Sequence, residues 1–143
     1  AKYLPMVSTE GVLSLILDRM KEQRNGLIAA NVQETDLAGH SQDPVRYADR
    51  LKTVDTFLPH ILENMEDEDV LIITGDHGND PTIGHSHHTR ERTVLLVYGR
   101  KLKKVNLGVR PTLSDIGATV AEYFKVDLPE SGNSFLNEVL QNK

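Results

Sequence analysis

Apolar positions recur along the chain at helical spacing in three stretches. They run from Thr9 to about Gln23, from Pro44 to Met65 and from Thr112 to Phe124, with apolar residues three and four positions apart. Thr112-Leu-Ser-Asp115 also resembles a capping box, which marks a helix start. We therefore expect three amphipathic helices and a short final helix over residues 134–140.

Three short apolar runs, residues 27–33, 70–74 and 93–98, predict strands. The run Val70–Thr74 is rich in β-branched residues and lies between an acidic turn and Gly75, a pattern typical of a strand buried in a parallel sheet. Helices and strands follow one another along most of the chain. The pattern thus predicts an α/β fold with a largely parallel sheet flanked by helices.

Length and composition narrow this picture. A chain of 143 residues favours one α/β unit over residues 1–143. With a net charge of -5 and no long basic run, nucleic acid is not expected as a partner. The absence of cysteine excludes thiolate metal sites and fits a reducing compartment. Apolar runs are only strand-sized and the N-terminus lacks a signal-peptide pattern, so we expect a cytoplasmic protein without a membrane partner.

Carboxylate and imidazole side chains follow two of the expected strands. Asp36 and His40 come on the loop after the first strand, and Asp76 and His77 follow the second. Chemistry in α/β proteins gathers at the carboxyl ends of strands. Because neighbouring strands lie about 5 Å apart, the ends of both can contribute to one metal cluster.

His88 is a further candidate, eleven residues beyond His77 in the histidine-rich segment 84–91. Oxygen and nitrogen donors in this mixture suit Zn²⁺, Mn²⁺ or Fe²⁺ better than Ca²⁺ or Mg²⁺. A pair of divalent ions about 4 Å apart clamps a phosphoryl group and activates the attacking oxygen. The three segments together therefore predict a metal site for phosphoryl chemistry.

These motifs resemble a known family. Asp76-His-Gly-Asn-Asp-Pro-Thr82, followed by His88-Thr-Arg-Glu91, is similar to the metal-binding signature of phosphopentomutases, members of the alkaline phosphatase superfamily. Pro111-Thr-Leu-Ser-Asp-Ile-Gly-Ala-Thr-Val-Ala-Glu122 and Gly132-Asn-Ser-Phe-Leu136 are similar to the C-terminal end of that family. The resemblance implies the C-terminal part of an alkaline-phosphatase-like core. It also implies a metal-dependent phosphomutase that transfers phosphate between two positions of a sugar phosphate.

The resemblance implies ligands for two divalent ions, with Mn²⁺ as the first candidate and Zn²⁺ as the other. Asp36, His40 and His88 match the ligands of one ion, and Asp76 and His77 match two ligands of the other. In the family an N-terminal aspartate and a nucleophilic threonine complete the second site, and a cap domain recognises the sugar phosphate. No segment here matches them, so we expect the isolated chain to be inactive without the missing part.

Three more residues lie within the motifs: Asn79, Asp80 and Arg90. Each is a candidate to orient a ligand or to contact the substrate, since imidazole ligands usually donate to a carboxylate or a carbonyl. A turn role before Pro81 is an equal expectation for Asp80, and pairing with a nearby acid is the simpler expectation for Arg90.

The sequence departs from phosphopentomutases in places, and alternatives stay open. Asp36 and His40 have the tighter spacing of phosphoglycerate mutases and alkaline phosphatases. His87 stands where the family has aspartate, and Thr93-Val94 replaces valine-proline. A phosphoglycerate mutase or phosphatase of the same superfamily is therefore the second hypothesis. A non-catalytic metal-binding module that works with a partner is the third.

Overall fold

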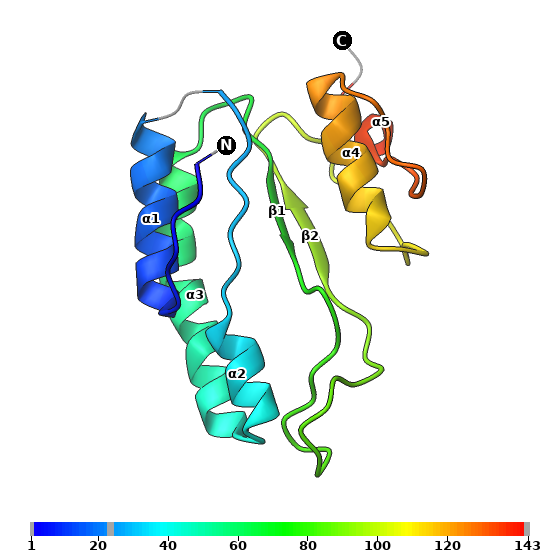
Figure 1. The fold of residues 1–143 in the computed structure, drawn as a ribbon. Helices are drawn as coiled ribbons and strands as arrows, with labels where there is room; N and C mark the ends of the chain where they lie inside the picture. The colour runs from blue at the N-terminus through cyan, green and yellow to red at the C-terminus, as the bar shows by residue number, and fades with distance from the viewer. Residues whose placement is uncertain (1, 23–24, 142–143) are drawn as a thin grey trace. The chain divides into compact units, whose positions relative to one another are not determined.

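The computed structural model of the chain describes residues 2–22 and 25–141 (Figure 1). Contacts divide it into two compact units, which we call the helical unit (residues 1–66 and 77–94) and the sheet unit (residues 67–76 and 95–143). The expected single α/β unit over residues 1–143 is not tested by this division and stays a prediction.

The helical unit contains α1 (Thr9–Glu22), α2 (Glu34–His40) and α3 (Pro44–Asn64). Both α1 and α2 pack on α3, and α1 lies alongside it in Figure 1. α3 begins where the sequence favours a start, because the Asp43 carboxylate accepts a hydrogen bond from the Arg46 amide and Pro44 opens the first turn. The buried apolar side chains of this unit are Val12, Leu13, Ala38, Ile61 and Met65.

One carboxylate joins the starts of α1 and α2. Glu34 Oε2 accepts a hydrogen bond of 2.7 Å from the amide of Thr9, the buried first residue of α1. This bond lowers the pKa of the Glu34 carboxyl, and the nearby guanidinium groups of Arg50 and Arg46 lower it further. The bond satisfies one of the amides that a helix start leaves without an intrahelical partner.

The sheet unit contains β1 (Leu71–Thr74), β2 (Leu95–Tyr98), α4 (Ser114–Phe124) and α5 (Leu136–Val139). The two strands pair antiparallel, from Leu71 opposite Tyr98 to Thr74 opposite Leu95. α5 packs on α4 (Figure 1). The buried apolar side chains here are Ala118, Ala121, Phe135, Leu136 and Val139.

A buried ion pair fixes the start of α4. Asp115, with no exposed surface, accepts hydrogen bonds of 2.8 Å from the Asn133 amide and from Arg110 Nε. The Asn133 amide and the Arg110 guanidinium hold the pKa of the Asp115 carboxyl below its usual value, although burial opposes them. The reciprocal capping box expected for Thr112-Leu-Ser-Asp115 is not formed, because the Asp115 carboxylate bonds to residues 110 and 133. Thr112 contributes only its hydroxyl oxygen, which accepts a hydrogen bond of 3.2 Å from the Ser114 amide at the start of the helix.

Two expectations about strands are not observed in the described residues. Residues 27–32 form no strand, and Leu27 and Ile28 are 59% and 38% exposed. A strand needs a hydrogen-bonded neighbour, and no described segment pairs with this one. The largely parallel sheet is likewise not observed, because β1 and β2 are antiparallel and β1 is only partly buried. The coarser expectation of a mixed helix and strand fold is met.

Element ends shift by a few residues. α1 ends at Glu22, and Gln23 lies outside the described residues. The last expected strand and the last expected helix are shorter than predicted, with β2 beginning at Leu95 and α5 covering Leu136–Val139. None of the helices in the described ranges combines the length and the apolarity needed to cross a bilayer.

Candidate metal centre

Two of the expected ligands come from one face of α2. The sequence predicted a loop for Asp36 and His40, and this was wrong, because both lie in the seven-residue helix Glu34–His40. The acidic residues in its first turn, Glu34 and Asp36, complement the helix dipole. Side chains four residues apart lie on the same side of a helix. The spacing of Asp36 and His40, which is tighter than in phosphopentomutases, therefore brings the carboxylate and the imidazole together.

The third ligand comes from the loop that follows β1. Gly78 and Thr89 form an isolated antiparallel bridge, with a 2.9 Å hydrogen bond from the Thr89 amide to the Gly78 carbonyl. A Cβ at residue 78 would lie 2.7 Å from the carbonyl oxygens of Thr89 and Glu91, so only glycine fits this approach. The bridge closes the loop and holds His88 beside it.

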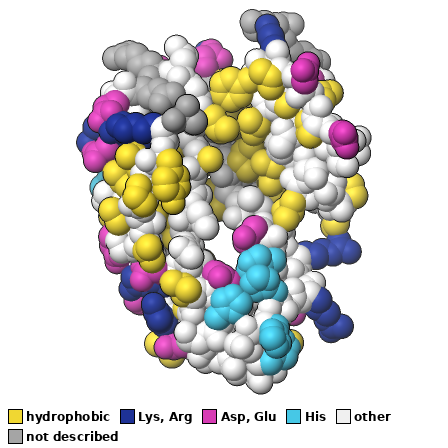
Figure 2. All heavy atoms as spheres, in the orientation of Figure 1, with side chains coloured by type: hydrophobic (Ala, Val, Ile, Leu, Met, Phe, Trp, Pro, Cys, Tyr) yellow, Lys and Arg dark blue, Asp and Glu magenta, His cyan; other side chains and the backbone are white. Residues whose placement is uncertain are grey.

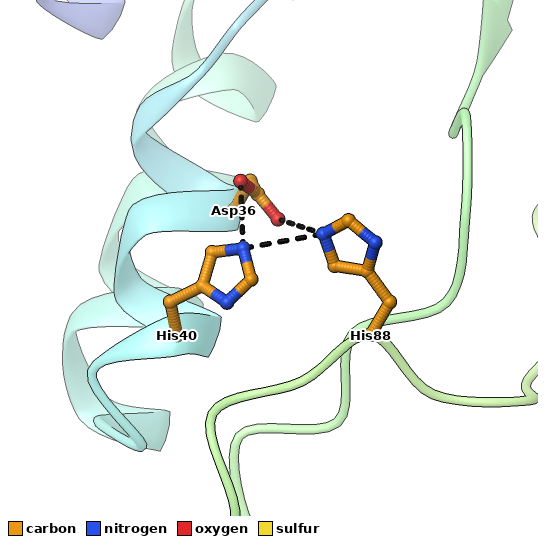
Figure 3. A group of neighbouring side chains, drawn as sticks. All are labelled: Asp36, His40 and His88. Carbon is orange, nitrogen blue, oxygen red and sulfur yellow. Dashed lines mark hydrogen bonds and ion pairs between the residues drawn. The ribbon is translucent and has the colours of Figure 1, made fainter.

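Asp36, His40 and His88 point toward one another (Figure 3). His40 Nε2 lies 3.3 Å from Asp36 Oδ2 and 3.2 Å from His88 Nε2, and His88 Nε2 lies 3.8 Å from Asp36 Oδ1. One donor atom from each residue lies within 4.8 Å of the others. Figure 2 shows histidine side chains gathered on one face with an acidic side chain next to them. One carboxylate and two imidazoles at these distances are suited to hold a divalent ion.

The backbone of the loop fixes the tautomer of His40. His40 Nδ1 lies 2.6 Å from the carbonyl oxygen of Ser86, and because a carbonyl can only accept, Nδ1 carries the hydrogen. In a neutral imidazole, Nε2 then presents a lone pair toward the Asp36 carboxylate. Two electron-rich atoms 3.3 Å apart repel each other unless a proton or a metal cation lies between them. This orientation of the ring is the one that metal-ligating histidines usually have.

The structure places His77 at the same carboxylate. The His77 ring stacks on His88 with centroids 3.5 Å apart, and its Nε2 lies 3.8 Å from Asp36 Oδ1. Asp76 is exposed and belongs to the sheet unit, whereas the other four predicted ligands belong to the helical unit. The helical unit thus brings together Asp36, His40, His77 and His88.

The three further candidates have different surroundings. The side-chain amide of Asn79 donates to Asp36 Oδ1 at 2.7 Å. Asp80 Oδ1 accepts hydrogen bonds from the amide and the hydroxyl of Thr82, which lower the pKa of the Asp80 carboxyl and are typical of a turn. Arg90 is exposed and directly follows the bridge residue Thr89.

Sequence reasoning missed two contributors, Ser86 and Gly39. Ser86 acts through a backbone carbonyl, for which a side-chain pattern gives no signal. Gly39 gave no signal either, because the sequence predicted a loop here and a glycine needs a packing reason only inside a helix. It is buried, and a Cβ there would lie 2.3 Å from the side chain of Asn79.

Comparison with known proteins agrees with a metal centre. The family model described as the metalloenzyme superfamily matches residues 2–128. The chain belongs to the metalloenzyme superfamily.

Within that superfamily its relatives include phosphopentomutases. The chain is 46% identical over 125 residues to the phosphopentomutase of Clostridioides difficile (strain 630), covering 86% of this chain and 32% of the relative. It is 44% identical over 135 residues to the phosphopentomutase of Herpetosiphon aurantiacus, covering 93% and 34%. For that of Alkaliphilus oremlandii the identity is 39% over 127 residues, covering 87% and 33%. The chain therefore spans about a third of the length of the curated relatives it matches.

Proposed function

We propose that the chain is the metal-binding C-terminal part of a phosphopentomutase-like enzyme, which transfers phosphate within a sugar phosphate. The observation that carries the proposal is the meeting of Asp36, His40 and His88 within 4.8 Å. Relatives of this name at 39–46% identity support the reaction class. A cytoplasmic location goes with the proposal, since a chain without cysteine suits a reducing compartment.

In this proposal Asp36, His40 and His88 hold one divalent ion, and Asp76 with His77 contributes to a second. The donor set fits Mn²⁺ best, with Zn²⁺ as the other candidate, because oxygen and nitrogen ligands without thiolate suit both ions. Two such ions, when bound, lower the pKa of an attacking hydroxyl and stabilise charge on the transferring phosphoryl group.

The remaining roles belong to residues around the ligands. Ser86 holds the His40 ring with Nε2 turned inward. Arg90 is proposed to meet the substrate phosphate, because its planar guanidinium suits phosphate oxygens. The rest of the longer enzyme is proposed to supply the nucleophilic threonine and the contacts to the sugar phosphate. A largely parallel sheet is proposed to form when β1 and β2 combine with strands of that remaining part.

Calorimetric titration of the chain with Mn²⁺ tests the metal site. We expect one ion to bind to the wild-type chain and no measurable binding to His88→Ala. His87→Ala is the matched control, since His87 is the exposed neighbour of His88 and should leave binding unchanged. Binding that survives His88→Ala, or no binding to the wild type, contradicts the proposal.

A second candidate is a phosphoglycerate mutase or phosphatase of the same superfamily. It is favoured by the four-residue spacing of Asp36 and His40, which α2 realises on one face. Assays of the longer enzyme on ribose 5-phosphate and on phosphoglycerate separate the two. A third candidate, a non-catalytic metal-binding module, predicts that the longer protein binds the ion and turns over neither substrate.

A further inference from the structure

The side chain of Asn79 makes two hydrogen bonds to Asp36. Its Nδ2 donates to the carboxylate Oδ1 at 2.7 Å and lies 3.2 Å from the backbone carbonyl oxygen of the same residue. The amide nitrogen carries two hydrogens, so it can make both bonds at once. Both residues lie in the helical unit, on α2 and on the loop that carries His88.

Gly39 provides the space for this contact. It is buried inside α2, and a Cβ built there would lie 2.3 Å from Asn79 Cγ and Oδ1 and 2.5 Å from Nδ2. The Asn79 amide therefore occupies the space that a side chain at residue 39 would fill. Glycine inside a helix is less favourable than alanine, so its presence in a helix of only seven residues has a packing reason.

A carboxylate that is free to rotate must be ordered when it binds an ion, and that ordering weakens the affinity. Asn79 removes this freedom, because one bond fixes the side chain of Asp36 and the other ties the same amide to its backbone. The carboxylate is thus held with Oδ2 3.3 Å from His40 Nε2.

We propose that Asn79, seated against Gly39, is a positioning residue that fixes the Asp36 carboxylate for metal binding. The inference rests on the proposed metal site and adds the pair of residues on which its affinity depends. Contacts of this kind around a metal ligand change affinity by about 10- to 100-fold.

The test is a double-mutant cycle, with the Mn²⁺ dissociation constant of the chain measured by calorimetry. Asn79→Ala removes the two hydrogen bonds to Asp36, and Gly39→Ala displaces the Asn79 amide by steric overlap. Each single change should weaken Mn²⁺ binding about 10- to 100-fold. The double variant should bind no more weakly than Asn79→Ala alone, because the alanine at residue 39 then meets no amide.

A control and a second readout separate positioning from general stability. Asn64→Ala loses a side-chain bond to the His60 carbonyl on α3, and it should leave Mn²⁺ affinity unchanged. The thermal midpoint without metal reports any purely structural effect, which would lower that midpoint and leave the affinity of the folded protein unchanged. If Asn79→Ala does not fold, Asn79→Leu keeps the branched side chain with the same number of heavy atoms, lacks the donor and carries the same expectation.

Failures of the inference and of the proposed site have different signatures. Wild-type binding that is lost in His88→Ala but unchanged, within about twofold, in both Asn79 variants overturns the inference alone. Single-variant losses that add up in the double variant overturn the coupling between Asn79 and Gly39. An absence of Mn²⁺ binding to the wild type overturns the proposed site, and the inference with it.

Discussion

The Nε2 atoms of His40 and His88 lie 3.2 Å apart, although the two residues are 48 positions apart in the sequence. His40 is turned to this point by the Ser86 carbonyl, and His88 is carried there by a loop that the Gly78–Thr89 bridge closes. The Asp36 carboxylate lies beside both rings. A site of this kind makes stability depend on metal.

Divalent metal should raise the thermal stability of the chain. An ion that binds only the folded state adds about 2.7 kcal/mol when its free concentration is 100 times the dissociation constant. We expect Mn²⁺ or Zn²⁺ to raise the melting temperature measured by circular dichroism, and a chelator to reverse the rise. His40→Ala should show no rise. An equal rise in that variant would place the binding elsewhere.

The isolated chain should bind one ion, and Asp76 should not be needed for it. The ligands that meet in the helical unit include Asp36, whereas Asp76 belongs to the sheet unit. We expect Asp36→Ala to abolish Mn²⁺ binding in calorimetry and Asp76→Ala to leave it unchanged. A stoichiometry of two ions per chain, or a loss of binding in Asp76→Ala, would contradict this prediction.

The buried Asp115 should matter strongly for the stability of the sheet unit. Removing one partner of a buried ion pair costs about 3–5 kcal/mol, because the other charge loses its compensation. Arg110 keeps its bond to Glu138 in Asp115→Asn, so we expect a loss near the lower end of that range in urea unfolding. Asp127→Asn, at an exposed position of the same unit, is the control and should change little. A loss in Asp115→Asn no larger than in this control would argue against the ion pair.

Acid should destabilise the chain through Glu34 and Asp115. Both carboxyl groups have pKa values lowered in the folded state, by the Thr9 amide for Glu34 and by the Asn133 amide for Asp115. Their contribution is therefore fully present above the unfolded values of about 4 and is lost as the pH falls through the folded values. The free energy of unfolding, measured in urea from about pH 6 to about pH 2, reports this loss, because carboxyl groups titrate within that range. In Glu34→Gln the pH dependence should be flatter, and an unchanged dependence would refute the role of that carboxylate.

The sequence by itself predicted the three longest helices well, but it missed the short helix α2 and predicted one strand that is not observed in the described residues. Helical hydrogen bonds are local, so the apolar period found α1, α3 and α4 to within a few residues. A strand is completed by a distant partner. Residues 27–32 have the composition of a strand, yet in the described residues no neighbour pairs with them. For the same reason, the sequence pattern did not reveal the antiparallel pairing of β1 and β2.

For the site, the sequence supplied the chemistry and the candidates: carboxylate and imidazole groups in motifs similar to those of a known metalloenzyme family. Only the tertiary structure decided how they meet. It placed Asp36 and His40 on a helix and brought His77 to the same carboxylate. It also showed that Asn79, in the space left by Gly39, bonds to Asp36, and that the Ser86 carbonyl orients His40. Residue type fixes which atoms can bind a cation. Distance and orientation depend on backbone contacts between segments far apart in the chain, which no local pattern encodes.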